Sequence, residues 1–221
     1  GKNGWDKLYG GDGNDKLVGG GKDDLLKGGI GNDKLIGGGG NDQLIGGDSI
    51  DTAIFGSGNN KIDLAITERQ GTKEGRDILK GIENVKGGDG NDLIKGDSVN
   101  NYLYGEAGND RLYGRDGDDR LYGRDGDDVL FGEVGNDIIF GGAGNNRLTG
   151  GAGRDKFCIS FGDGRDVITD YTTGEDKIKL LDGIPEELLN IRQIGEDVKI
   201  KYFGDLMAIV QGTLIADLTF I

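Results

Sequence analysis

The chain has 221 residues, and its 40 Asp and Glu against 26 Lys and Arg give a formal net charge of -14. It contains no His and one Cys, which excludes His-based acid–base catalysis, Ser-His-Asp triads, His-ligated zinc and an internal disulfide. The acidic balance argues against nucleic acid as a partner, and no run of about 18 apolar residues that could span a membrane is present.

Hydrophobic residues make up only 34% of the chain, whereas 47 residues are Gly. Low hydrophobicity with high net charge is typical of a chain that cannot collapse unaided. Because the sequence is nevertheless regularly repetitive, we expect that something cationic completes the fold. No signal peptide is visible, and the sequence starts without Met at position one of a repeat, so we expect a processed fragment of a longer protein.

A nine-residue pattern, Gly-Gly-x-Gly-x-Asp-x-U-x with U a large aliphatic residue, organises most of the chain. Clear copies lie at 10–18, 28–36 and 87–95. Six copies start between Gly1 and Gly46, and eight start between Gly87 and Gly150. A short fixed period is the signature of a solenoid. We therefore predict a first repeat block at residues 1–54 and a second at 87–158.

Residues 55–86 are predicted to be an insertion, because the distance from Gly46 to Gly87 is not a multiple of nine. The insertion contains an alternating strand at 62–66, a polar turn near Gly71 and a partial repeat at 75–79. After Cys158 the pattern fades, and 159–221 is predicted to be a C-terminal capping and secretion segment. It should contain a short helix after Pro185 and strands near 198–203 and 206–211.

Within each repeat, positions one to four are Gly-rich and fit a tight, partly left-handed turn, whereas positions seven to nine read as a strand. Six turn residues and three strand residues make half a coil, so two repeats should form one coil of 18 residues with two parallel sheets. The aliphatic position eight should face the core. This predicts an all-β solenoid with a β-rich C-terminal cap.

Aromatic residues gather at position nine of the second block. Coil geometry places Tyr104, Tyr122 and Phe140 in one outward ladder, and Tyr113 and Phe131 in the other. Stacking that stiffens the sheets is one interpretation, and an exposed stripe that binds a partner is the alternative. Cys158, also at position nine, is interpreted as an incidental semi-buried thiol.

Stacking repeat i on repeat i+2 should align the position-six carboxylates in columns along both edges. Carboxylates about 5 Å apart repel one another unless a cation lies between them, and Gly-rich turns leave carbonyls that need partners. A flexible, all-oxygen cage favours Ca²⁺ over Mg²⁺ or Zn²⁺. The predicted carboxylate ligands are Asp6, Asp15, Asp24, Asp33, Asp42, Asp51, Asp92, Asp110, Asp119, Asp128, Asp137 and Asp155. An EF-hand would need flanking helices, and a phosphate-binding loop would need Ser or Thr after Lys22; neither is present.

These repeats resemble the glycine-rich nonapeptides of the RTX (repeats-in-toxin) family of hemolysin-type, type I-secreted calcium-binding proteins. The resemblance implies a right-handed parallel β-roll in which each Ca²⁺ lies between repeats i and i+2, held by both position-six Asp and by carbonyls of positions one to four. The implied carbonyl ligands are Gly11, Gly13, Gly28, Gly29, Gly31, Gly37, Gly105, Gly108, Gly114, Gly117, Gly123, Gly126, Gly132, Gly135, Gly141 and Gly150.

Departures from the repeat predict weaker or empty sites. Asn101 and Asn146 replace Asp at position six, and Lys22, Ser49 and Val99 replace Gly at position four. Asp77, Asp166 and Asp176 lie in incomplete repeats and are further candidate ligands. Counting one site for each i/i+2 pair predicts about ten Ca²⁺, which would add about +20 charges to the acidic chain.

The predicted function is a calcium-binding module that folds outside the cell and serves as a secretion and folding scaffold of an extracellular or cell-surface protein. The alternative is the C-terminal module of a larger secreted enzyme, toxin or adhesin whose activity lies upstream of Gly1. We find no catalytic constellation in the sequence and expect no enzyme activity from it. Residues 216–221 resemble the acidic-then-apolar terminus that a type I secretion apparatus recognises. No surface or protein ligand is identified.

Overall fold

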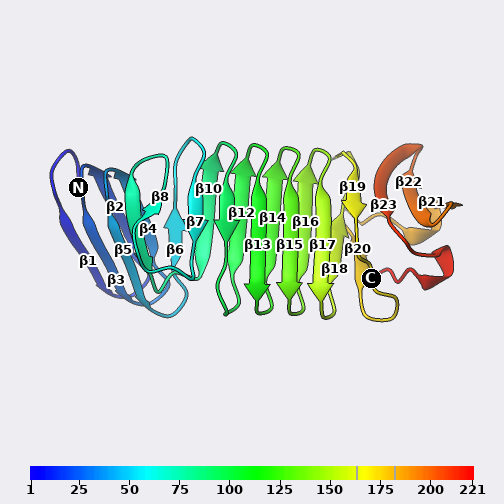
Figure 1. Ribbon diagram of the computed structural model, residues 1–221, viewed down its shortest axis with the longest axis horizontal. Coiled ribbons are helices and arrows are strands. Elements are labelled where there is room, and N and C mark those ends of the chain that lie inside the picture. Colours follow the sequence, from blue (N-terminus) through cyan, green and yellow to red (C-terminus); the bar gives the residue numbers. More distant parts are fainter. Residues whose placement is uncertain (163, 182) are drawn as a thin grey trace.

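The computed structural model describes residues 1–162, 164–181 and 183–221. The chain forms an elongated stack of coils with the N-terminus at one end and the C-terminal segment at the other (Figure 1). The strands of the stack are parallel and belong to three sheets. The predicted all-β parallel solenoid is therefore confirmed.

The first sheet has five strands from the N-terminal part of the chain. In spatial order they are β1 (Lys7–Asp12), β3 (Leu25–Ile30), β5 (Gln43–Asp48), β9 (Arg76–Lys80) and β8 (Gln70–Gly71).

The second sheet runs along the whole roll. Its nine strands are β2 (Lys16–Gly21), β4 (Lys34–Gly39), β6 (Thr52–Ile54), β10 (Asn84–Asp89), β12 (Tyr102–Ala107), β14 (Arg120–Asp125), β16 (Ile138–Ala143), β18 (Lys156–Ile159) and β20 (Lys177–Leu180).

The third sheet continues the side of the roll that the first sheet starts. Its nine strands are β7 (Lys61–Asp63), β11 (Leu93–Lys95), β13 (Arg111–Asp116), β15 (Val129–Val134), β17 (Arg147–Ala152), β19 (Asp166–Ile168), β23 (Asp205–Val210), β22 (Asp197–Tyr202) and β21 (Leu189–Ile194).

The register of the stack follows the repeat. Leu103 of β12 pairs with Leu121 of β14, and Leu121 pairs with Ile139 of β16, so each repeat lies on the repeat two further along the chain. This confirms the predicted coil of two repeats. The position-eight side chains form the core, as predicted, and Leu26, Leu103, Leu121 and Phe157 are fully buried.

The strands of the complete repeats are longer than predicted. Most run for six residues, from position seven of one repeat to position three of the next, so the expectation of three strand residues was wrong for them, whereas β6 and β11 have three. Ladder pairing skips position one in both neighbouring strands, and position two takes a left-handed conformation, so the register is kept and the strand continues. Only positions four to six make the turn. Glu106 and Arg115 occupy position two with φ of 79° each, which costs about 1 kcal/mol relative to glycine at each position.

The insertion lengthens one coil without interrupting the second sheet. Thr52 of β6 pairs with Asn84 of β10, and Ile54 pairs with Lys86. On the opposite side, the chain passes from β6 to β7 and returns through β8 to β9, which pairs with β5. Arg115 donates from both Nη1 and Nη2 to the carboxylate of Asp63 at 2.7 Å and so fastens β7 to the second block. The domain boundaries at residues 54, 86 and 158 stay predictions.

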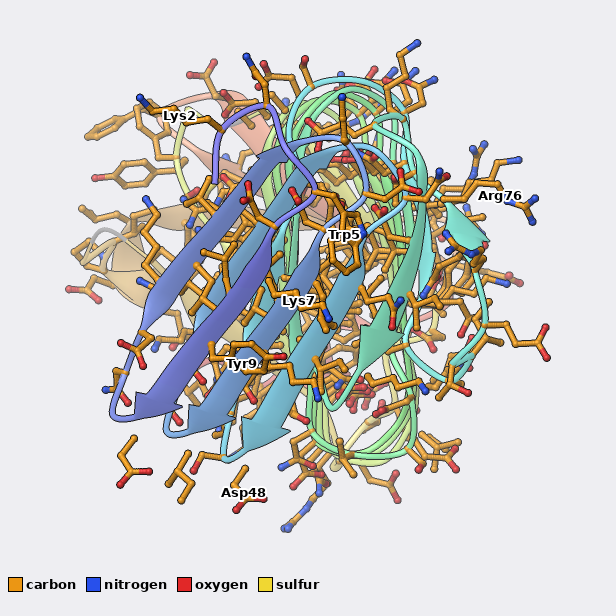
Figure 2. The ribbon with its side chains drawn as sticks, turned by 90° about the vertical axis from the view of Figure 1, so that its left-hand side faces the viewer. Lys2, Trp5, Lys7, Tyr9, Asp48 and Arg76 are labelled. Atoms are coloured by element: carbon orange, nitrogen blue, oxygen red, sulfur yellow. The ribbon has the colours of Figure 1, made fainter. Side chains whose placement is uncertain are left out.

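The first coil lies at an end of the stack. Figure 2 looks onto this end, where Trp5, Lys7 and Tyr9 lie on the first turn and strand. The ring of Trp5 is exposed, and the Nζ of Lys7 lies 4.9 Å from its centroid. Leu8 is the one position-eight leucine of the first block that is only partly buried. It has neighbouring coils on one side only.

An antiparallel hairpin closes the C-terminal end. β22 pairs with β21 and β23, and β23 pairs in parallel with β19, the last strand of the roll on that side. The helix expected after Pro185 is a single 3₁₀ turn at Glu186–Leu188, and a second 3₁₀ turn covers Ile215–Asp217. The last residues bridge to β20 through Ile178 and Phe220. In the residues that are described, no helix has the length and apolar character needed to cross a membrane.

The two predicted aromatic ladders are confirmed. The ring of Tyr122 stacks on Tyr104 and on Phe140 with centroid distances of 4.6 Å, and Tyr113 stacks on Phe131 at 5.0 Å. Because the rings cover each other's faces, the ladder fits the stiffening interpretation better than an exposed stripe.

We expect Tyr122→Ala to lower the free energy of unfolding by about 2 kcal/mol, because it removes two stacked pairs of about 0.5–1.5 kcal/mol each together with buried ring area. Denaturant titration in saturating calcium measures the loss. Tyr122→Phe keeps both stacks and should unfold close to the wild type. Equal stability of the alanine variant and the wild type would contradict the stiffening role.

Candidate calcium centres along the turn edges

Side chains at position six form three hydrogen-bonded columns along the edges of the roll. In the part of the chain that is described, the N–H of most of these Asp donates to Oδ1 of the side chain one coil further on, at 2.7–2.9 Å, and that of Asp51 donates to Oε2 of Glu83. The first column is Asp6, Asp24, Asp42 and Asp77; the second is Asp15, Asp33, Asp51, Glu83, Asn101, Asp119, Asp137, Asp155 and Asp176; the third is Asn60, Asp92, Asp110, Asp128, Asn146 and Asp166. The groups of Asp predicted to share an edge are the groups found together.

The second carboxylate oxygen of most of these Asp residues has no hydrogen-bond partner although it is buried. A buried acceptor without a partner costs several kcal/mol if it carries charge, so such groups require a cation or a proton. These orphaned Oδ2 atoms belong to Asp15, Asp24, Asp33, Asp42, Asp51, Asp92, Asp110, Asp119, Asp128, Asp137 and Asp155.

Most of the orphaned oxygens lie close to a backbone carbonyl of the next coil. A Cβ built on Gly123, at position one, would lie 2.2 Å from Oδ2 of Asp128 and 2.5 Å from the carbonyl oxygen of Gly141. The same pair of atoms surrounds Gly114, where a Cβ would lie 2.3 Å from Oδ2 of Asp119 and 2.7 Å from the carbonyl of Gly132. Two acceptors therefore converge at a place that only Gly leaves open, and a hard cation satisfies both.

The remaining Gly positions let the coils approach closely. A Cβ on Gly31, at position four, would lie 2.3 Å from the carbonyl oxygen of Gly13, and one on Gly29, at position two, would lie 2.2 Å from that of Gly11. Lys22 and Ser49 keep the left-handed conformation of position four, with φ of 72° and 91°. At Val99 the turn is held differently, because its N–H donates to Oδ1 of Asp97. The weaker binding predicted for these turns stays a prediction.

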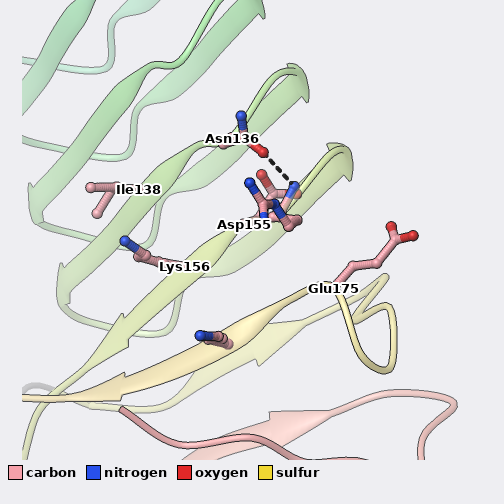
Figure 3. A pocket seen from close by; sticks show the side chains of 7 residues that line it. Asn136, Ile138, Asp155, Lys156 and Glu175 are labelled. Carbon is pink, nitrogen blue, oxygen red and sulfur yellow. Dashed lines mark hydrogen bonds between the residues drawn. The ribbon is translucent and has the colours of Figure 1, made fainter.

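A second ladder runs outside the carboxylates at position five. Figure 3 shows Oδ1 of Asn136 accepting the N–H of Arg154 from the next coil, at 3.0 Å, beside the turn that carries Asp155. A shallow surface pocket here is lined by Ile138, Lys156 and Glu175. The ladder fixes the turn that places Asp155 and does not use its Oδ2.

Burial raises the pKa of the column carboxyls. Loss of water raises the pKa of Asp42, Asp92, Asp119, Asp128, Asp137 and Asp155 to about 7, and that of Asp51 and Asp110 to about 6. Neighbouring carboxylates add to the rise in Asp128 and Asp137, whereas the backbone N–H donated to each oxygen opposes it. In the protein without metal, the carboxyls whose pKa lies near 7 are therefore partly protonated at neutral pH.

The candidates in incomplete repeats lie at the ends of the columns. Asp77, Asp166 and Asp176 are buried, as are Asn101 and Asn146. Oδ2 of Asp77 accepts the hydroxyl of Thr72, and Oδ2 of Asp176 accepts the N–H of Thr172. These carboxylates therefore differ from the eleven with an orphaned oxygen.

Two members of the columns, Asn60 and Glu83, were not predicted from the sequence. Asn60 stands nine residues after Asp51, with Gly58 at position four and Ile62 at position eight, so the first block continues in phase into the predicted insertion. Glu83 accepts the N–H of Asp51 through Oε2 and has no spacing that would identify it.

The site consists of paired carboxylates and carbonyls. Within the described ranges, no group of three or more His, Cys, Asp or Glu side chains is placed to hold a metal ion. A group of that kind consists of side chains only, so its absence is compatible with a cage whose other ligands are backbone carbonyls. Cys158 is buried, and burial raises the pKa of its thiol to about 11, so it is a poor nucleophile.

Comparison with known families identifies the repeats. The model of the RTX calcium-binding nonapeptide repeat matches residues 1–35, 18–53, 28–62, 77–98, 86–121, 96–130 and 122–157, which together cover more than half of the chain. The chain belongs to the RTX calcium-binding nonapeptide repeat family. The repeats of this RTX chain therefore bind calcium and form a parallel β-roll, as the resemblance implied.

Two solved structures also align with the chain. The extracellular lipase LipA from Serratia marcescens aligns at 19% identity and a TM-score of 0.42 over 94% of this chain and 40% of the lipase chain. The AlgE6R3 subunit from the Azotobacter vinelandii mannuronan C5-epimerase aligns at 24% identity and a TM-score of 0.25, over 57% of this chain and 80% of the subunit. This chain thus spans less than half of the lipase that it matches. A search of the curated proteins finds no match.

Proposed function

We propose that this RTX chain is a calcium-driven folding module of a secreted protein, with about ten ions held along its turn edges. The observation that supports it best is the set of eleven buried Asp residues whose Oδ2 atoms have no partner. Each such oxygen and the facing carbonyl would hold one ion, and the ion supplies the positive charge that lets stacked carboxylates stay together. The proposed ligands are the twelve Asp of the complete repeats and the carbonyls of the Gly-rich positions.

The chain's own residues prepare these sites. The N–H donated from the coil below fixes Oδ1 of each Asp and so orients Oδ2. The left-handed Gly residues bring neighbouring turns within reach of each other. The core is a stack of single aliphatic side chains, which is too thin to offset the ordering entropy of a Gly-rich chain alone. Binding and folding should therefore be one event.

The proposed location is outside the cell, where calcium is abundant. RTX repeat proteins are typically secreted, and a chain that stays unfolded without calcium can be exported before it folds. Residues 216–221 are proposed to contact a type I secretion apparatus. In the folded chain this segment is tied to β20, because the N–H of Ile178 donates to the carbonyl of Thr219 and the N–H of Ile221 donates to that of Ile178. It would be accessible to the apparatus only before folding. The parent protein is proposed to be a larger secreted enzyme, toxin or adhesin.

Counting bound ions tests the calcium sites. We expect the wild type to bind about ten Ca²⁺ by native mass spectrometry and titration calorimetry, and Asp128→Asn to bind one fewer, because an amide nitrogen or a neutral oxygen replaces the orphaned Oδ2. Asp127→Asn is the matched control, since Asp127 is exposed and uses Oδ1 to accept the N–H of Asn145, which an amide oxygen also accepts. The control should keep the wild-type count. A wild type that binds no calcium, or equal counts for both variants, would refute the sites.

A further inference from the structure

Three Asn residues interrupt the carboxylate columns, and their side-chain amides are all hydrogen-bonded. Asn60 and Asn146 lie at the two ends of the run Asp92, Asp110 and Asp128 in the third column, and Asn101 lies in the second. All three are buried. None of their polar atoms is without a partner, in contrast to the orphaned Oδ2 atoms of the Asp residues between them.

At Asn60 an N–H group makes the contact that the Asp residues leave open. Its Nδ2 donates to the carbonyl of Gly87 at 3.1 Å and to that of Gly58 at 2.8 Å. Gly87 is at position one of the next coil, the same position whose carbonyl faces Oδ2 elsewhere, as Gly141 faces Asp128. The amide thus joins two carbonyl oxygens.

At Asn146 the amide joins a carbonyl to a carboxylate. Its Oδ1 keeps the ladder contact by accepting the N–H of Asp128 at 2.9 Å. Its Nδ2 donates to the carbonyl of Gly142 at 3.1 Å and to Oδ1 of Asp166 at 2.9 Å. A Cβ on Gly141 would lie 2.5 Å from this nitrogen, whereas a Cβ on Gly123 meets the carboxylate oxygen of Asp128 at 2.2 Å. The nitrogen therefore occupies the place of the orphaned oxygen.

We propose that Asn60 and Asn146 are built-in substitutes for the cation at the two ends of the run of three Asp in the third column. Their N–H groups supply the positive partner that calcium supplies at Asp92, Asp110 and Asp128. This inference rests on the proposed calcium sites and adds to them that Asn60 and Asn146 bind no ion. In the folded chain these two residues need no ion to complete their hydrogen bonds, and calcium uptake between them is confined to the three Asp.

Donors of the chain itself also complete the interruption at Asn101 and the C-terminal ends of the first and second columns. Asn101 donates from Nδ2 to the carbonyl of Glu83 at 2.9 Å, and its Oδ1 accepts the N–H of Asp97 at 2.8 Å. At Asp77 the donor is the hydroxyl of Thr72, at 2.8 Å, and at Asp176 it is the N–H of Thr172, at 2.7 Å.

Replacing each Asn by Asp tests whether its amide takes the place of the cation. In the full chain at saturating calcium, we expect Asn146→Asp to bind one more Ca²⁺ than the wild type, counted by native mass spectrometry, because it adds a second oxygen beside Asp166 and removes the N–H. Asn60→Asp should also gain one ion. Asn109→Asp is the control: it adds the same charge at the exposed position five and keeps an oxygen to accept the N–H of Asp127, and its count should be unchanged.

The outcomes separate this inference from the proposed function. A wild type without bound calcium overturns the proposed function itself. If the wild type binds calcium but neither Asn→Asp variant gains an ion, the amides do not take the place of the cation. Asn60 and Asn146 then either already hold ions or lie at places that cannot hold one. Failure of both variants to fold in calcium also overturns the inference, because the column should accept Asp at these places.

Discussion

Removal of calcium is expected to abolish most of the far-UV circular dichroism of the β-roll. At free calcium 100-fold above Kd, each bound ion stabilises the fold by about 2.7 kcal/mol. About ten ions would then outweigh the whole stability of a typical domain, about 5–15 kcal/mol. Without them, eleven buried carboxyls lose their counter-charge. Adding excess EGTA to the calcium-loaded protein at neutral pH should convert the β spectrum to one of an unfolded chain.

Magnesium is the control for this experiment. Mg²⁺ demands near-ideal octahedral geometry and gives up its waters reluctantly, whereas carboxylate and carbonyl cages of variable shape suit Ca²⁺. Adding Mg²⁺ to the chelated protein should leave it unfolded, and excess Ca²⁺ should restore the β signal. A folded spectrum in chelator at neutral pH would show that the roll does not depend on calcium.

Acid is expected to stabilise the metal-free roll but to weaken the binding of calcium. Burial raises the pKa of Asp92, Asp128 and Asp155 from 3.8 to about 7, so the metal-free folded state binds protons more tightly than the unfolded chain does. The resulting stabilisation is fully present below pH 3.8 and is lost as the pH rises through about 7. With calcium, protons compete for the same oxygens, so affinity should fall as the pH falls through about 7.

Two titrations check this reversal. Circular dichroism in calcium-free buffer from pH 8 to pH 4 should show β structure increasing towards acid, at constant ionic strength. Calorimetry with calcium over the same range should show affinity decreasing and protons released on binding. A calcium affinity that does not change between these limits would contradict protonation of the column carboxyls.

The period of the sequence was sufficient to predict the columns and the core. Once repeat i lies on repeat i+2, the positions of Asp119 beneath Asp137 and of Leu121 beneath Ile139 follow from counting. The strand length did not follow, because it depends on whether pairing resumes at position two. A left-handed residue at position two leaves position one unpaired but lets the strand continue, and Arg115 and Glu106 take this conformation although they are not Gly.

The insertion and the cap were less predictable, because their contacts are not set by the period. Asn60 keeps the phase but lies in the segment assigned to the insertion, and Glu83 reaches Asp51 from a shortened turn. The parallel pairing of β19 with β23 joins residues about forty apart, such as Ile168 with Val210, and no repeat specifies it. Hydrogen bonds that complete the ends of the columns are similarly local and depend on single donors such as Thr72.

The path of the chain through the insertion has a mechanical consequence. One face of the roll is a sheet that is hydrogen-bonded from β2 to β20, whereas the opposite face is divided between β9 and β7. Backbone hydrogen bonds resist stretching along the roll on the continuous face, whereas on the divided face contacts such as the one from the N–H of Asp63 in β7 to Oε1 of Gln70 in β8 must do so. We therefore expect the roll to be most compliant at this point and to bend so that the divided face opens. Tension applied along its axis should separate it here first, into two blocks that each keep their own ions.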